Sequence, residues 1–140
     1  MKTYNIDKQL VQAHLELLRS VKQEMRPTSG IVNLTLVQLN VLIFLHENKR
    51  ALVSDIAGYF GIAIPSGTVL VDRLVALKLV ERRPDVEDRR KIRISLTQRG
   101  KKLLVEAMKE REFMAKRLFS RLTLKDKSDF LRIIKHIIQN

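Results

Sequence analysis

The sequence predicts a mainly helical protein with one small β-hairpin, an α+β fold. Three observations support this prediction. Apolar residues recur at three- and four-residue steps through much of the 140-residue chain, as expected for amphipathic helices. Residues 91–96 instead alternate strictly between polar and apolar side chains, which is typical of a strand. Gly61 and Pro65 lie between two short apolar segments and indicate a tight turn between helices.

The first predicted element is an amphipathic helix over residues 7–26. Pro27 and Gly30 are expected to end it. Its apolar stripe includes His14, which is more often a packed core or interface histidine than a ligand contact at such a position. The other residues of the stripe are Leu10, Val11, Leu17, Leu18, Val21 and Met25.

A second helix is predicted to start at Thr35, which forms a capping box with Gln38. Its apolar residues between Leu36 and Leu45 cover nearly all sides. We therefore expect this helix to be buried at the centre of the fold. Residues 47–50 are expected to form the turn that follows it.

Two further helices are predicted over residues 53–60 and about 65–79. Gly61 suits a left-handed position at the end of the first. Pro65 suits the first turn of the second. Two short helices joined by a tight glycine-containing turn form the helix-turn-helix pattern.

A β-hairpin is predicted to follow directly, with strands at residues 79–83 and 91–96. The polar loop between them, residues 84–90, carries arginines at its tip. A helix-turn-helix with such a hairpin after it is a winged helix, with the hairpin as its wing. The hairpin interior can pack on the helices while its tip stays free to reach a nucleic acid.

Two amphipathic helices complete the chain, and we expect Thr97 to cap one and Thr123 to start the other. With the first helix, they carry more apolar surface than one small winged helix could cover. Exposed stripes of that kind mark association, so we expect a homodimer. Residues 1–33 and 101–140 would form its helical dimerisation region, and residues 34–100 the winged-helix lobe.

The charge of the chain favours a polyanionic partner. Its 27 Lys and Arg residues against 15 Asp and Glu give a net charge of +12. Residues 65–140 carry +10 of this and residues 1–64 only +2. Such clustering points to nucleic acid or to an anionic membrane surface.

Other classes of function find little support. The chain has no cysteine, hence no disulfide, cysteine zinc site or thiol sensor. It has no catalytic motif, and its three histidines are widely separated, so neither an enzyme nor a metal or other cofactor is expected. Polar residues interrupt the uncharged run 27–46, so no membrane span is expected. The N-terminus lacks an apolar signal-peptide core, which predicts a cytoplasmic protein.

Several segments resemble the MarR family, the multiple-antibiotic-resistance type of transcriptional regulator. The resemblance covers roughly residues 5–138. Its wing signature is an Asp-x-Arg followed by a strand ending in apolar-x-Leu-Thr. The segments that carry it are Val71-Asp72-Arg73-Leu74, Leu79-Val80-Glu81-Arg82-Arg83-Pro84-Asp85, Asp88-Arg89-Arg90 and Ile94-Ser95-Leu96-Thr97.

The resemblance implies a homodimeric repressor that binds double-stranded DNA at a pseudo-palindromic operator. Each lobe would place a recognition helix in the major groove and a wing arginine in the minor groove, and a small aromatic anion would release the DNA. The candidate binding site for this effector lies near His14. The recognition-helix residues implied are Pro65, Ser66, Gly67, Thr68, Val69 and Arg73. The wing residues are Arg83, Asp88, Arg89, Arg90 and Lys91.

The residues themselves support contacts with DNA. Arg82, Arg83, Arg89, Arg90, Lys91 and Arg93 supply donors for phosphates. Arg89 or Arg90 suits a narrow minor groove. Asp88 is expected to pair with an arginine and so hold the shape of the loop tip.

Four positions depart from the family pattern. Ala63 replaces a serine that commonly caps the recognition helix. Lys78 replaces a usual glycine, so we expect the helix to end with a different cap. Gly67 replaces a β-branched residue that packs the recognition helix, which should loosen its first turn. Val69 stands where a long polar residue often faces DNA, which predicts weaker base readout.

The alternative is an architectural or RNA-binding winged-helix protein without ligand-regulated release. Base-stacking aromatics would favour single-stranded RNA, yet Tyr59 and Phe60 lie in an apolar helical pattern and are expected in the core. A sequence-specific footprint would favour the regulator, and uniform coating of any duplex would favour the architectural protein.

Overall fold

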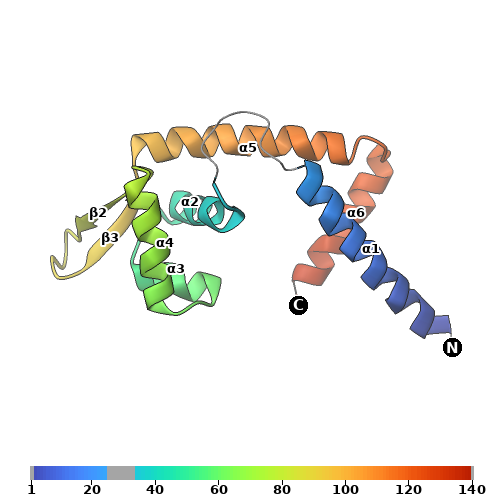
Figure 1. Ribbon diagram of the computed structural model, residues 1–140, viewed down its shortest axis with the longest axis horizontal. Helices are drawn as coiled ribbons and strands as arrows, with labels where there is room; N and C mark the ends of the chain where they lie inside the picture. Colours follow the sequence, from blue (N-terminus) through green and yellow to red (C-terminus); the bar gives the residue numbers. More distant parts are fainter. Residues whose placement is uncertain (1, 25–33, 140) are drawn as a thin grey trace. The chain divides into compact units, whose positions relative to one another are not determined.

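The computed structural model describes residues 2–24 and 34–139, so the expected helix end at Pro27 and Gly30 lies outside the described residues. The chain is mainly helical with a small antiparallel sheet, which confirms the predicted fold class (Figure 1). Its elements are α1 (Lys2–Glu24), α2 (Leu36–Asn48), β1 (Arg50–Ala51), α3 (Val53–Phe60), α4 (Ile64–Ala76), β2 (Val80–Pro84), β3 (Ile92–Leu96), α5 (Gln98–Leu118) and α6 (Leu124–Ile138).

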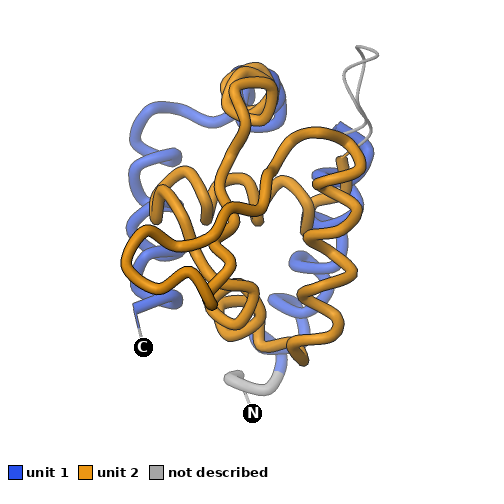
Figure 2. Tube along the Cα trace, turned by 90° about the vertical axis from the view of Figure 1, so that its left-hand side faces the viewer, with its two compact units in different colours: residues 1–28, 109–140 blue, residues 29–108 orange. Residues whose placement is uncertain are grey.

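The elements belong to two compact units (Figure 2). One consists of Met1–Thr28 with Lys109–Asn140, and holds α1, the second half of α5 and α6. The other, Ser29–Met108, holds the helix-turn-helix, the sheet and the first half of α5. We call them the terminal unit and the winged-helix unit.

α2 lies within the core of the winged-helix unit, as its apolar sequence predicts. The predicted capping box is present: the Gln38 N–H donates to Thr35 Oγ1 at 3.2 Å, and the Thr35 N–H donates to Gln38 Oε1 at 2.9 Å. Around α2 pack buried side chains from α3, α4, the sheet and α5. With Leu42 and Leu45 of α2, the core includes Ile56, Val71, Leu74, Ile94 and Leu103 from these elements, and Leu79, which precedes β2.

The sheet has three strands in the order β1-β3-β2, both pairs antiparallel. The predicted hairpin is β2 and β3, with Val80 opposite Leu96 and Pro84 opposite Ile92. β1 was not predicted, because it has two residues and lies where we expected a turn. It pairs with β3 and buries Ala51 in the core.

The helix-turn-helix has the expected turn but ends earlier than expected. Gly61 adopts φ 61° and ψ 33°, the predicted left-handed position. α4 ends at Ala76, before the predicted end near residue 79, because Lys78 also adopts a left-handed φ of 58°. The Lys78 N–H donates to the Val75 carbonyl at 2.8 Å. The expectation of a different cap is therefore wrong, since Lys78 takes the conformation that glycine favours.

The start of α5 is fastened to the residue that precedes β2. The Gly100 N–H donates to Thr97 Oγ1 at 3.0 Å, which confirms the predicted cap. The same hydroxyl donates to the Lys78 carbonyl at 2.7 Å, and the Thr97 N–H donates to the Leu79 carbonyl at 3.0 Å. Gly100 is so close to the residue before β2 that a Cβ would lie 2.0 Å from the Leu79 carbonyl oxygen.

The terminal unit is much less buried than the winged-helix unit. α6 begins with the capping box of Thr123 and Asp126, and Phe119 meets Phe130 with ring centroids 5.6 Å apart. Arg117 pairs with Glu24 at 3.4 Å. Yet no residue of α6 is buried, and large apolar side chains of α1 and α6 face solvent.

Among the described residues, no single helix is long and apolar enough to cross a membrane. α3 and α4 pass that test only as a pair, bent by 111°. The apolar character of this pair has another explanation, since Ile56, Val71 and Leu74 are fully buried in the core.

Candidate nucleic-acid interface

α4 is held close to α3 at Gly67. This residue is buried, and a Cβ built on it would lie 3.2 Å from the Ala57 Cβ and 3.4 Å from Val53 Cγ1. The close approach explains why a larger side chain is absent. The expected loosening of this turn stays a prediction.

The outer surface of α4 carries the predicted recognition residues. Pro65, Ser66, Val69 and Arg73 are exposed. Thr68 is partly buried, and its hydroxyl donates to the Ile64 carbonyl at 3.1 Å.

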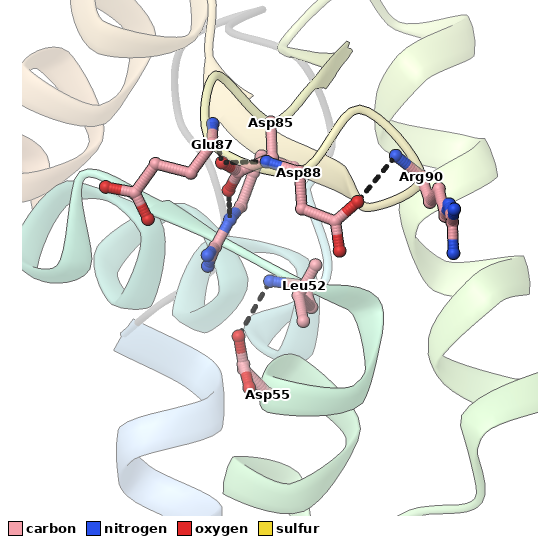
Figure 3. A network of polar contacts seen from close by, with 7 residues as sticks. Leu52, Asp55, Asp85, Glu87, Asp88 and Arg90 are labelled. Carbon is pink, nitrogen blue, oxygen red and sulfur yellow. Dashed lines mark hydrogen bonds and ion pairs between the residues drawn. The ribbon is translucent and has the colours of Figure 1, made fainter.

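The wing loop is organised by Asp85, which is 4% exposed. Its Oδ1 accepts from the Glu87 N–H at 2.8 Å (Figure 3), and its Oδ2 accepts from Arg93 Nε. The Asp85 N–H donates to the Lys91 carbonyl at 2.8 Å across the loop. The hydrogen bond from Arg93 and then that from the Glu87 N–H are the main causes that lower the pKa of Asp85 from 3.8 to about 2.

Asp88 shapes the tip differently from our expectation. Its Oδ1 accepts from the Arg90 backbone N–H at 3.1 Å (Figure 3), and its carbonyl accepts from the Lys91 N–H at 2.9 Å. In the described part of the chain it pairs with no arginine side chain. The aspartate of this loop that pairs with an arginine is Asp85, which is buried and meets Arg93 of β3.

The cations of the hairpin fall into two groups. Three arginines are paired with carboxylates: Arg82 with Asp72 at 2.6 Å, Arg83 with Glu81 at 2.9 Å, and Arg93 with Asp85. Arg89, Arg90 and Lys91 are exposed, and their side chains have no ion-pair partner among the described residues. From the sequence, all six were expected to supply donors for phosphates. That expectation missed Asp85 and Arg93 as a structural pair, although an aspartate at the end of one strand and an arginine on the polar face of the next were visible signals.

The Asp85–Arg93 pair predicts a pH dependence of stability. The pKa of Asp85 is lower in the folded chain, so its ion pair stabilises the fold fully above about pH 4 and loses that effect as the pH falls toward 2. Asp85→Asn should therefore lower the melting temperature by a constant amount between pH 5 and 7, and by less below pH 4.

Thermal unfolding followed by circular dichroism checks this. Asp88→Asn is the matched control, because an amide oxygen can still accept from the Arg90 N–H. A difference between wild type and Asp85→Asn that stays unchanged from pH 7 to pH 2 would contradict the assigned role of the pair.

The histidines lie on three different helices. His14 is on α1, His46 on α2 and His136 on α6, and all three are exposed. The described residues contain no group of three His, Asp or Glu side chains that could hold a metal ion. Two surface clefts of about 540 and 500 Å³ in the terminal unit do not include His14. The effector site near His14 stays a prediction.

Tyr59 is not in the core, contrary to expectation. It is 62% exposed, because it lies near the C-terminal end of α3 with only part of its ring covered. The ring contacts Phe44 and Phe60, with centroid distances of 4.7 and 4.9 Å. Phe60 is half-buried at the edge of the core.

A helix-turn-helix with an exposed helix surface and a cationic wing is the arrangement of the winged-helix regulators. A family model described as the MarR family matches residues 32–91, which hold α2 to α4, β2 and the wing loop. Over these residues the chain matches the MarR family.

The chain is also similar to individual relatives and solved structures. YfiV of Bacillus subtilis strain 168, described as an uncharacterized HTH-type transcriptional regulator, is 29% identical over 112 residues, which cover 78% of this chain and 70% of YfiV. The crystal structure of YusO from Bacillus subtilis is 26% identical, with a TM-score of 0.66, and the match covers 98% of this chain and 92% of YusO. BpsR of Bordetella bronchiseptica, whose DNA binding is regulated by 6-hydroxynicotinic acid, is 21% identical, with a TM-score of 0.70 and coverage of 96% and 94%.

The family match over residues 32–91 confirms the resemblance to the MarR family seen in the sequence. Members of this family are transcriptional regulators and not enzymes. They bind DNA, function as dimers and bind small-molecule ligands. The chain is therefore a transcriptional regulator with a winged-helix fold.

Proposed function

We propose that this MarR-family chain is a homodimeric repressor that binds a pseudo-palindromic operator in double-stranded DNA. α4 occupies the major groove, and the wing enters the flanking minor groove. The observation that carries this proposal is the difference between the ion-paired and the unpaired cations of the hairpin. Among the described residues, Arg89, Arg90 and Lys91 have no ion-pair partner, and they lie on a loop that Asp85 and Asp88 hold in shape. The other three arginines of the hairpin are engaged in ion pairs. A cytoplasmic location, expected from the sequence, is part of the same proposal.

Selection of bound duplexes from a random pool, followed by footprinting, tests this function. We expect an inverted repeat whose half-sites lie about one helical turn apart, because the two lobes of a symmetric dimer each read one half-site. Uniform protection of any duplex would support the architectural alternative. Preferential binding of single-stranded RNA would support the RNA-binding one.

The dimer is proposed from the uncovered apolar faces of the terminal helices, within residues 1–33 and 101–140. No residue of α6 is buried, and Ile137 and Ile138 are 69% and 72% exposed. An amphipathic helix gains most of its stability from packing its apolar face. A second copy of the chain is the partner that supplies this packing, in keeping with a family whose regulators function as dimers.

Light scattering should therefore give about twice the chain mass of 16.3 kDa at micromolar concentration. Ile137→Asp should shift the chain toward monomer, because it would bury an unpaired carboxylate in the dimer contact. Val86→Asp makes a similar change on the exposed wing and should leave the dimer intact. A wild-type mass of 16.3 kDa would contradict the dimer.

We also propose that a small aromatic anion releases the operator. The support is the regulation of BpsR by 6-hydroxynicotinic acid, together with the basic character of this chain. Calorimetric titration with 6-hydroxynicotinic acid and a panel of phenolic acids tests the proposal. A bound acid should weaken operator binding. If the effector site lies near His14, His14→Ala should lower the affinity of the chain for the acid. The absence of binding by any of these acids at millimolar concentration would exclude this effector class.

A further inference from the structure

The first two turns of α4 expose a surface with few hydrogen-bond donors. Ile64 and Val69 are 56% and 52% exposed. Pro65 has no N–H, and Gly67 is buried against α3. No residue from 64 to 70 carries a charge or a side-chain amide.

The hydroxyl groups of these turns add little donor capacity. Thr68 already donates its hydroxyl proton to the Ile64 carbonyl at 3.1 Å. Ser66 is exposed and can donate to a base or a phosphate. A single hydroxyl does not select one base, since bidentate contacts to guanine and adenine need Arg, Lys, Asn or Gln.

Charged side chains appear only near the end of α4. Asp72 is paired with Arg82 at 2.6 Å, so the net charge of that pair is neutral. Arg73 lies seven residues after Ser66, roughly 10 Å further along the helix axis. Base edges are contacted chiefly by the N-terminal residues of a recognition helix. Arg73 is therefore positioned to contact the sugar-phosphate backbone of the DNA rather than a base edge.

Apolar contact remains as the means of reading bases from this surface. Thymine alone presents a methyl group in the major groove, at C5. We propose that Val69 reads the operator by packing against thymine C5-methyl groups. The inference rests on the proposed function, because it requires α4 in the major groove, and it adds the chemistry and the base that α4 recognises.

The expected size of the effect follows from the burial of one methyl-sized apolar group. Such a group contributes about a fourfold change in affinity. Two symmetry-related half-sites give about sixteenfold when the thymine is changed in both. Ser66, three residues before Val69, lies on the same face of the helix, where it can contact the adjacent phosphate or base.

Deoxyuridine provides a direct test, because it differs from thymidine only by the missing C5-methyl group. A duplex selected from a random pool is resynthesised with dU at each thymine in turn, and binding is measured for three chains. The chains are the wild type, Val69→Ala and Val105→Ala. Val105 is the matched control, a helical valine with the same 52% exposure on α5.

We expect one or two thymines in each half-site at which dU weakens the wild type about fourfold. Val69→Ala should lose most of this dU effect, and Val105→Ala should keep it whatever its own affinity. Specific binding with no dU effect, or a dU effect that persists in Val69→Ala, would overturn the inference and leave the proposed function standing. The absence of any sequence-specific duplex would overturn both.

Discussion

Gly100→Ala is expected to lower the free energy of unfolding by about 3 kcal/mol or more. The new Cβ would lie 2.0 Å from the Leu79 oxygen and 3.0 Å from its carbonyl carbon. Both atoms belong to the backbone of the residue before β2 and cannot swing away as the end of a long side chain can. The first turn of α5 would have to withdraw, which breaks the hydrogen bonds of Thr97 to Lys78 and Leu79.

Urea denaturation followed by circular dichroism measures this change. Gly58→Ala is the matched control, because a Cβ at that position in α3 meets nothing within 4 Å. It should raise stability by about 0.5–1 kcal/mol through the higher helix propensity of alanine. A Gly100→Ala chain as stable as the wild type would show that α5 does not begin so close to Leu79.

The helix ends that carry a local cap were the most predictable part of the fold, because neighbouring residues set them. Thr35 with Gln38, and Thr123 with Asp126, cap helices with groups only three residues apart. Gly61 likewise ends α3 through its own backbone conformation. Where the deciding contact is distant in the sequence, prediction failed. β1 exists because Arg50 and Ala51 pair with Ser95 and Ile94.

The candidate interface was predicted in outline but not in its internal pairing. The positions of the wing and of α4 followed from the order of helices, turn and alternating strand. The separation of free from paired cations did not, because it depends on which carboxylate each arginine meets across the hairpin. Gly67 shows the same limit, since its role depends on the distance to Ala57 on another helix.

Arg89→Ala and Arg90→Ala are expected to weaken binding to specific and scrambled duplexes alike. Both side chains are exposed and without an ion-pair partner among the described residues, so they are free to meet phosphates or the minor groove. Each cation that neutralises a phosphate contributes about 1 to the slope of log affinity against log salt. A dimer has two wings, so each substitution should lower that slope by about 2 and weaken binding roughly tenfold or more near physiological salt.

A salt series with both duplexes measures affinity and slope together. Lys125→Ala on α6 is the charge-matched control, because it removes one positive charge per chain outside the winged-helix unit. It should change the slope by much less than either wing variant. This comparison separates local contacts from the general effect of a lower net charge.

Lysine variants divide the wing contact further. A phosphate contact needs mainly a positive charge, whereas a narrow minor groove favours the guanidinium of arginine. Lysine at either position should restore the salt slope, because the charge is restored. It should restore the full affinity for the duplex only at the position whose side chain lies outside the minor groove. Binding that neither alanine variant alters, in affinity or in slope, would show that the wing makes no DNA contact. The free cations of the wing would then need another explanation, and the proposed operator complex would lose its main support.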